Sequence, residues 1–427
     1  MSTERHGSDK YRIRPACPAA VRALMRRFAA HGEVAYPVGG CVRDALRGTP
    51  PHDWDVAVTT PPERTAAICE AAGWRVIPTG VKHGTVTVLV PDDDGTRLPI
   101  ECTTCRTEGG YTDGRHPDAV TFTGLIEDDL SRRDFTVNAL ALTHVPARDA
   151  KDEDDENIFA VIDLFGGMED LEGRVIRCVG DPCVRLTEDA LRILRAVRFA
   201  VKLGFEIHPD PRGAGAARAD GRARISRERI RDEFEKILLS PDPVRGVGLL
   251  TELGLIPYVL PRGIAPSGVG DMAALPPDFS TRLACLLWGM SPDAAKENLR
   301  ALRLSNEQMD TAVTLQGGRL PTEATPYAAR CLRRDYGLLA DALLCIAQAH
   351  GTDVAALRAL VEASATAGDP VRVSDLAVDG RDLRALGVPP GRAIGEVLAT
   401  LLDEVLADPT QNTKERLSDR VREMRFV

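Results

Sequence analysis

The sequence predicts an N-terminal α+β domain with a mixed sheet, followed by an all-helical remainder. Between residues 20 and 145, stretches with strand periodicity and stretches with helix periodicity alternate along the chain, which is typical of a sheet with helices packed on it. From residue 187 onward, almost every apolar pattern has a helical period. Aromatic residues make up only 4% of the chain, and this scarcity favours helices over an all-β fold.

The N-terminal elements follow from local apolar patterns and from the glycines and prolines between them. In chain order we expect a helix at 19–30, a strand at 33–37 that enters a glycine turn, a helix at 42–46, a strand at 54–58, a helix at 61–72, and two strands at 85–90 and 98–104 joined by the turn 91–95.

The 427 residues are too many for one compact core. We expect a head over residues 1–145 and two helical divisions, a neck over 146–240 and a body and tail over 241–427. Residues 149–157 are almost all charged or polar, so we interpret them as a solvated loop. Residues 262–277 are rich in Gly, Pro and Ala and predict a linker or long loop.

The charge distribution matters more than the net charge of −9, which by itself does not indicate a nucleic-acid partner. Residues 185–236 contain 13 Lys and Arg against nine Asp and Glu, and such a basic stretch can bind RNA phosphates. The ten cysteines lack convincing zinc-site spacing, and no apolar run approaches the roughly 18 residues of a membrane span. We expect a cytoplasmic protein with reduced thiols, no membrane partner and an oligomeric state that the sequence leaves open.

A glycine pair, Gly39 and Gly40, precedes the second predicted helix. Glycines let backbone N–H groups approach an anion closely, and the start of a helix adds a favourable dipole. Arg43 lies in the first turn of that helix, where a guanidinium group can reach a phosphate. An ordinary turn is the alternative, because a lone glycine pair is common.

Asp53 and Asp55 are two residues apart at the next predicted strand, so their side chains should project from one face. Two adjacent carboxylates repel unless a cation lies between them, and hard oxygen ligands suit Mg²⁺. Glu101 lies on another predicted strand. It becomes a third catalytic carboxylate if the two strands are neighbours, and otherwise it is a charge on an edge strand.

These residues belong to longer motifs. Residues 39–44 (GGCVRD), running to Asp53-Trp54-Asp55, resemble the first motif of the class II tRNA nucleotidyltransferases, a family that includes bacterial poly(A) polymerases within the polymerase β-like superfamily. Further resemblances follow in order, at 80–87 (GVKHGTVT), 101–122 (ending YTDGRHPDAVTF), 129–140 (DLSRRDFTVNAL), 162–171 (IDLFGGMEDL), 187–198 (TEDALRILRAVR) and 225–238 (ISRERIRDEFEKIL). The resemblance implies a polymerase β-like head followed by helical neck, body and tail.

The resemblance also implies roles for the head residues. Asp53 and Asp55 would hold two Mg²⁺ ions, which activate an RNA 3′ hydroxyl and stabilise the leaving pyrophosphate. The triphosphate would lie against Gly39, Gly40 and Arg43. Arg132, Arg133 and Asp134 are expected to open a helix after an acidic turn, and Arg133, Asp134 and Asn138 would bind the nucleotide and its ribose.

In the neck we expect one helix over residues 187–202 with Thr187 as its N-cap. Glu188, Arg192 and Arg195 would then share one stripe, and Asp189 and Arg192 would be adjacent at i, i+3. Without the other motifs, a solvated face with salt bridges is the alternative.

Base chemistry gives Asp189 and Arg192 a sharper role. A carboxylate accepts a hydrogen bond from the amino group of cytosine or adenine, and Arg192 can donate to N3 or N1. Guanine and uracil present a carbonyl oxygen instead, which the carboxylate repels. The resemblance implies that the two residues select C and A without a nucleic-acid template. Glu188 would orient Arg192, while Arg195 and Arg198 would face the nucleotide.

Two features distinguish members of the family. Residues 79–86 lack the Gly-Arg/Lys-Arg/Lys-Phe segment usual in bacterial poly(A) polymerases, and residues 109–117 supply a candidate flexible loop that enzymes adding only cytidines tend to lack. We expect an enzyme that adds C, C and A to the tRNA 3′ end from CTP and ATP. An A-adding enzyme or a poly(A) polymerase are the alternatives within the family, and a catalytically inactive RNA-binding protein is the alternative outside it. Residues 283–290 contain no His-Asp pair, so we expect no phosphohydrolase activity.

Overall fold

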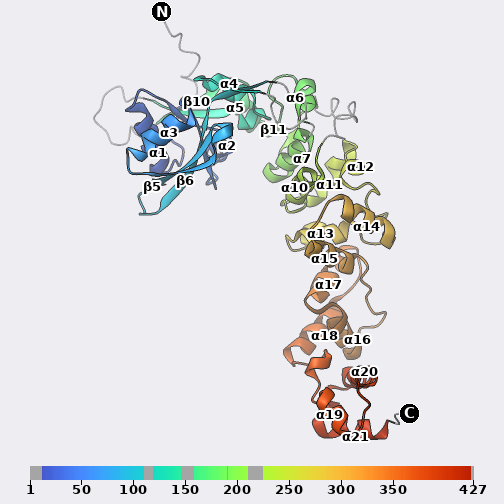
Figure 1. Cartoon of the computed structure of the whole chain (residues 1–427). Helices are drawn as coiled ribbons and strands as arrows, with labels where there is room; N and C mark the ends of the chain where they lie inside the picture. Colours follow the sequence, from blue (N-terminus) through green and yellow to red (C-terminus); the bar gives the residue numbers. More distant parts are fainter. Residues whose placement is uncertain (1–11, 110–118, 146–157, 190, 210–224, 425–427) are drawn as a thin grey trace, which may run out of the picture. The chain divides into compact units, whose positions relative to one another are not determined.

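The computed structural model describes residues 12–109, 119–145, 158–189, 191–209 and 225–424. The chain divides into two compact units, which are Met1–Ile237 with Leu249–Gly254 (unit 1) and Leu238–Gly248 with Leu255–Val427 (unit 2). The expected fold class is confirmed, because a mixed sheet with helices is followed by helical segments (Figure 1). None of the described helices combines the length and the apolar character that a membrane crossing needs.

The main sheet of unit 1 has five strands in the order β2-β3-β6-β5-β4. β3 and β6 are parallel, and the other neighbouring pairs are antiparallel. The bounds are β2 Ala35–Pro37, β3 Trp54–Val58, β4 Arg75–Gly80, β5 Thr85–Pro91 and β6 Arg97–Thr104. The sequence pattern did not predict β4, which has few buried side chains.

The head core lies on one face of this sheet. The helices α1 (Ala19–Ala29) and α3 (Pro62–Glu70) cover that face (Figure 1), and they pack against the buried side chains of β3, β5 and β6. β3 alternates strictly, because Trp54, Val56 and Val58 belong to this core, whereas Ala57 packs on the opposite face against α4 (Ile126–Ser131). The alternation leaves Asp55 on the face away from α1 and α3.

Smaller sheets complete unit 1. β1 (Arg12–Ile13), β10 (Phe159–Asp163) and β9 (Leu140–His144) form an antiparallel sheet, which meets the main sheet at a bridge between Val38 and Ala141. The remaining elements are α2 Gly40–Leu46, β7 Arg106–Gly109, β8 Ala119–Phe122, the 3-10 helices Val81–His83 and Thr136–Asn138, α5 Gly167–Glu172, β11 Val175–Ile176, α6 Pro182–Glu188, α7 Arg192–Leu203, β12 Glu206–Ile207 and α10 Arg227–Leu238.

Unit 2 consists of helical elements over its described residues, preceded by α11 (Pro243–Glu252), which both units share. Its helices are α12 Ile256–Val259, α13 Phe279–Leu286, α14 Pro292–Ala301, α15 Asn306–Gln316, α16 Pro326–Tyr336, α17 Ala340–Ala349, α18 Ala355–Thr366, α19 Gly380–Ala385, α20 Arg392–Ala407 and α21 Lys414–Glu423. Many begin at a residue whose side chain accepts a backbone N–H of the first turn, as Ser305 does in a complete capping box with Gln308.

A buried arginine joins three segments of unit 2. Arg282 is 5% exposed, and its guanidinium group donates to the carbonyl oxygens of Leu238, Ser240, Leu275 and Pro276. Met in its place fills the space but removes the hydrogen bonds that Arg282 donates to these carbonyl groups. We expect Arg282→Met to lower the free energy of unfolding by about 3 kcal/mol, measured by urea denaturation. The exposed Arg300→Met is the control, and equal stabilities of the two variants would contradict the role.

Candidate active site

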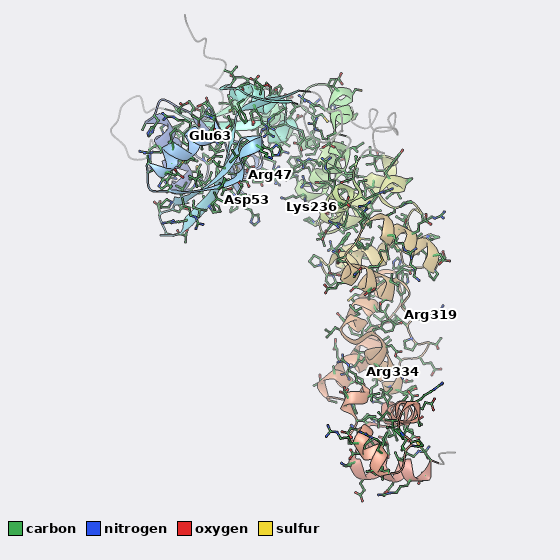
Figure 2. The ribbon with its side chains drawn as sticks, viewed as in Figure 1. Arg47, Asp53, Glu63, Lys236, Arg319 and Arg334 are labelled. Carbon is green, nitrogen blue, oxygen red and sulfur yellow. The ribbon has the colours of Figure 1, made fainter. Side chains whose placement is uncertain are left out.

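Three carboxylates lie together on the exposed face of the main sheet. β3 and β6 are adjacent parallel strands, and Asp55 is directly opposite Glu101 in their register. Asp53 immediately precedes β3 (Figure 2). Trp54, between the two aspartates, is 2% exposed in the core, whereas Asp53, Asp55 and Glu101 are all exposed. The strand adjacency that the sequence left open is therefore present.

The electrostatics of these carboxylates fit a divalent cation. Although Asp55 keeps an exposed side, desolvation by the surrounding protein raises the pKa of its carboxyl group. Arg133 opposes this shift, and the nearby Glu101 and Asp53 reinforce it. A bound cation would relieve this repulsion between like charges. Within the described ranges, however, no three Asp, Glu, His or Cys side chains converge closely enough to hold a metal.

The glycine turn faces an arginine of another segment. Gly39 has a φ of 82°, which side chains rarely adopt, and its N–H donates to the carbonyl of Leu140 at 3.0 Å. A Cβ atom on Gly39 would lie 2.5 Å from Nη1 of Arg133. Glycine is thus favoured by the backbone conformation, and a side chain at this position would also displace the guanidinium group of Arg133.

Arg43 is buried rather than directed at an open phosphate site. It is 3% exposed, and its guanidinium group pairs with Asp44 at 2.9 Å and donates to Oδ1 of Asn138. In this structure Arg43 therefore joins α2 to the 3-10 helix Thr136–Asn138.

The Arg132-Arg133 pair ends a helix instead of opening one, so that expectation was wrong. The acidic residues that looked like a turn form the first turn of α4, where carboxylates are favoured by the helix dipole, and Arg132 is the C-cap. The buried Asp129 accepts hydrogen bonds from both Arg132 and Arg133, which lie three and four residues further along. Asp129 thereby fixes Arg133 between Gly39 and Asp55.

The Asp129 carboxylate should also contribute to stability in a pH-dependent way. Burial raises its pKa, but Arg133 and Arg132 more than offset this, so its pKa lies below the usual 3.8. The contribution is fully present above the unfolded pKa and is lost as the pH falls through the lower folded value. Asp129→Asn should cost about 3 kcal/mol at pH 7, and the difference from wild type should shrink toward pH 3. Urea unfolding at both pH values measures this, with Glu127→Gln as control, and a pH-independent difference would contradict it.

Asp134 and Asn138 continue the network that begins at Arg43. Asp134 Oδ2 accepts from Nε and Nη2 of Arg195 at 2.8 and 2.6 Å, and Oδ1 accepts from the Asn138 side chain at 3.2 Å. Burial raises the pKa of Asp134, but Arg195 and Asn138 outweigh it and keep the pKa below the usual value. A continuous chain of side chains thus runs from Arg43 through Asn138 and Asp134 to Arg195 on α7.

The aromatic ring of Phe199 packs against three arginine side chains. The guanidinium carbons of Arg43, Arg195 and Arg198 lie 5.4, 5.7 and 4.3 Å from its ring centroid, within the range of cation–π attraction. Arg198 also faces the buried Glu233 of α10, with Nε 3.0 Å from Oε2. No role was predicted from the sequence for Phe199, Glu233 or Asp129. The i+3 and i+4 spacing of the arginines after Asp129 was the available signal for that residue.

The single helix expected over residues 187–202 is wrong. The chain forms α6, which begins at Pro182 after the N-cap Asp181, and α7, which begins at Arg192. Thr187 lies within α6 and is not an N-cap, so Glu188 and Arg192 belong to different helices. Asp189 is extended (φ −143°, ψ 102°), and its Oδ1 accepts the N–H of Leu191 at 2.9 Å, a local bond that competes with helix continuation.

The break places Asp189 and Arg192 side by side with separate partners. Asp189 Oδ2 accepts from Arg229 of α10 at 2.6 Å, and Arg192, which is 7% exposed, donates to the carbonyl of Arg185 at 3.0 Å. The Glu188 side chain lies outside the described residues. The same holds for the acidic segment 149–157 and for residues 110–117 of the candidate loop 109–117.

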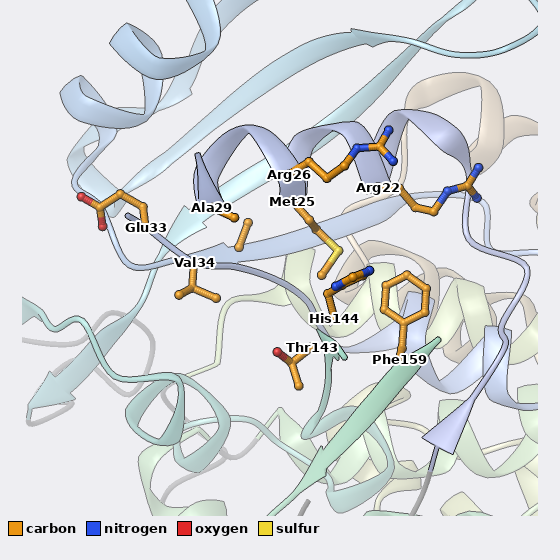
Figure 3. Close-up of a pocket in the computed structure, with 10 residues that line it drawn as sticks. Arg22, Met25, Arg26, Ala29, Glu33, Val34, Thr143, His144 and Phe159 are labelled. Atoms are coloured by element: carbon orange, nitrogen blue, oxygen red, sulfur yellow. The ribbon is translucent and has the colours of Figure 1, made fainter. Parts of the chain in front are cut away.

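A separate apolar pocket of about 250 Å³ lies elsewhere in unit 1. Figure 3 shows its lining, which includes Met25 of α1, Val34 just before β2, and His144 and Phe159. The glycine turn follows the opposite end of β2, and none of the predicted site residues lines the pocket.

Comparison with known proteins decides the family. Residues 35–177 match the model of the poly(A) polymerase head domain. Residues 204–264 match "Probable RNA and SrmB- binding site of polymerase A", and residues 280–421 match a second-domain model of tRNA nucleotidyltransferases. The CCA-adding enzyme of Limosilactobacillus fermentum is 36% identical over 414 residues, which are 94% of this chain and 96% of that protein. The chain belongs to the CCA-adding enzyme family.

Further relatives of the CCA-adding family agree. The CCA-adding enzyme of Lactiplantibacillus plantarum is 34% identical over 425 residues, 96% of this chain and 97% of that one. The Bacillus stearothermophilus CCA-adding enzyme, solved in complex with CTP, superposes with a TM-score of 0.76 at 31% identity, covering 95% of this chain and 96% of that one. The resemblance inferred from the motifs is thereby confirmed. The chain is a nucleotidyltransferase, and its family implies a divalent metal.

Proposed function

We propose that this protein adds C, C and A to the 3′ end of tRNA from CTP and ATP, without a nucleic-acid template. The observation that carries this proposal is the full-length similarity to CCA-adding enzymes, combined with the paired carboxylates of β3 and β6. A tRNA substrate and ten free cysteines support a cytoplasmic location.

We assign the metal to the exposed carboxylates. Asp53 and Asp55 would hold two Mg²⁺ ions, with Glu101 as the third carboxylate beside them. A divalent metal here would supply activation of the 3′ hydroxyl and stabilisation of the leaving pyrophosphate. The pair suits this task because both groups are exposed and mutually repelling, so they are available as anionic oxygen ligands.

The triphosphate would lie at the glycine turn. Gly39 is the N-cap of α2 and Gly40 its first residue, and Arg133 is fixed beside Gly39 by Asp129, so a cation lies close to the start of a helix. Arg43 would act mainly by holding Asn138. Asp134 and Asn138 would meet the ribose, which requires Asp134 to exchange one of its bonds with Arg195 for the sugar hydroxyl.

The break between α6 and α7 would read the base. Asp189 accepts from the amino group of cytosine or adenine, and Arg192 donates to N3 or N1. Glu188 would orient Arg192, and Arg195 and Arg198 would face the nucleotide or its phosphates. The neck over residues 146–240 and the helical body over 241–427 remain our proposed divisions for base selection and tRNA binding, with the head over 1–145.

The proposal is tested with three tRNA transcripts that end before CCA, after C and after CC. Each is incubated with the enzyme, Mg²⁺ and CTP, ATP or both, and the products are sized on a sequencing gel. Ordered addition of C, C and A is expected. Addition of A to the CC transcript alone would indicate an A-adding enzyme, long A tails a poly(A) polymerase, and no incorporation an inactive RNA-binding protein.

A further inference from the structure

The base-reading carboxylate is held from both sides. Asp189 Oδ1 accepts the backbone N–H of Leu191 at 2.9 Å, and Oδ2 accepts from Nη2 of Arg229 at 2.6 Å. The two side chains are largely shielded, at 13% exposure for Asp189 and 23% for Arg229. Because one partner is the neighbouring backbone and the other is a cation on α10, the plane of the carboxylate is fixed by two different segments.

We propose that Arg229 is a positioning residue that determines nucleotide specificity by holding the Asp189 carboxylate in place. The proposal rests on the function proposed above, in which Asp189 reads the base. Arg229 acts through Asp189 and need not touch the nucleotide. The sequence motif at 225–238 contains Arg229, but no spacing rule connects it to a residue 40 positions earlier.

The physical reason lies in how a wrong base is rejected. Cytosine and adenine gain a hydrogen bond from a correctly placed carboxylate, whereas uracil and guanine meet a repulsive contact between two oxygens. A repulsive contact discriminates only if the repelling group cannot turn away. An ionised carboxylate has about four acceptor positions, so two can be used for tethering while others remain available to the base amino group.

A second ion pair fixes the helix that presents Arg229. Glu233 lies one turn further along α10 and is 4% exposed, and it faces Arg198 at 3.0 Å and Arg195 at 3.9 Å on α7. Arg229 and Glu233 therefore pair with opposite charges on the α6–α7 segment. The hydroxyl of Ser226 adds a weaker tether, because it accepts the N–H of Arg229 at 3.4 Å. These contacts set the register of α10 and hence the position of Arg229.

The test compares CTP with UTP on the full-length enzyme. A tRNA transcript ending before CCA receives one nucleotide at a time, and kcat/KM is measured for each nucleotide in wild type, Arg229→Met, Arg229→Lys and the control Arg231→Met. Arg231 lies on the same helix but pairs with Asp232. We expect Arg229→Met to reduce the CTP/UTP ratio about tenfold, a middle value for coupled residues of one ion-pair network. Arg229→Lys should restore most of the ratio, and Arg231→Met should leave it unchanged.

The outcomes separate specificity from folding. Equal losses for CTP and UTP in Arg229→Met would overturn the proposal, because a purely structural residue lowers both. Should this variant unfold, Arg229→Gln removes the charge at similar length, and an unchanged ratio in that variant overturns the proposal equally. A wild-type enzyme that adds uridylate as readily as cytidylate would instead refute the proposed function. If the wild-type enzyme prefers CTP over UTP and Arg229→Met shows the same CTP/UTP ratio, the proposed function stands and this inference alone is refuted.

Discussion

Asp55→Asn is expected to reduce nucleotide addition about 1,000-fold, the scale on which enzymes lose rate when one group that stabilises transition-state charge is removed. Asn keeps the shape of the side chain but loses the negative charge of Asp55. The substitution therefore removes one anionic metal ligand, and it also removes the repulsion of Asp55 by Asp53 and Glu101 that a divalent cation would relieve. The rate is measured in single turnovers with a tRNA transcript ending in CC, ATP and excess Mg²⁺.

The same substitution should leave the fold intact. The Asp55 carboxyl group is exposed and receives no hydrogen bond from any residue that the structure describes, and its main-chain oxygen, which accepts from Val38, is retained. Asp93→Asn, in the exposed turn between β5 and β6, is the matched control and should keep full activity. An Asp55→Asn enzyme with more than a tenth of the wild-type rate would rule out Asp55 as an essential metal ligand.

Asp189→Asn should change which nucleotide is added, with about a 100-fold fall in the preference for CTP over UTP. A carboxylate can only accept hydrogen bonds, whereas an amide can also donate. The Asn side chain can therefore turn its NH₂ group toward O4 of uracil and replace a repulsive contact by a hydrogen bond. The amide also loses the ion pair with Arg229, which makes this rotation easier.

The measurement is kcat/KM for each of the four nucleoside triphosphates on transcripts ending before CCA and after CC. On the second transcript, Asp189→Asn should add guanylate in place of adenylate, because O6 of guanine is accommodated in the same way. Asp232→Asn, on the exposed side of α10, is the control. A proportional loss for all four nucleotides would mean that Asp189 supports the neck without reading the base.

Local patterns in the sequence were sufficient for four of the five strands of the main sheet, which are β2, β3, β5 and β6, and for one face of the site. The alternation around Trp54 placed Asp53 and Asp55 on the same side of β3, and the buried Trp54 bears this out. The place of Glu101 opposite Asp55 depended on strand order, which arises from packing of the whole sheet and not from any local pattern. For that reason the sequence left Glu101 as a conditional third carboxylate.

The neck shows where local rules fail. A helical period continues through residues 187–202, but a single side-chain bond from Asp189 to the N–H of Leu191 ends the regular geometry. The partners that matter there are distant in sequence, since Asp134 and Arg195 are 61 residues apart and Asp189 and Arg229 are 40 apart. Periodicity carries no information on such pairs, because it reports only which side of a helix is apolar.

The chain of side chains from Arg43 through Asn138 and Asp134 to Arg195 bears on how such enzymes can diverge and be recombined. Its four members come from three segments of the polypeptide, so a chimera that joins the head of one homologue to the neck of another inherits Arg43, Asp134 and Asn138 from one parent and Arg195 from the other. Replacing Asp134 without Arg195 removes the nearer carboxylate from a partly buried cation, and the reverse replacement removes the cation from a carboxylate that is only 10% exposed. Neutral drift at these positions must therefore pass through paired exchanges, and crossover points between residues 138 and 195 should be tolerated only between parents that share both ends.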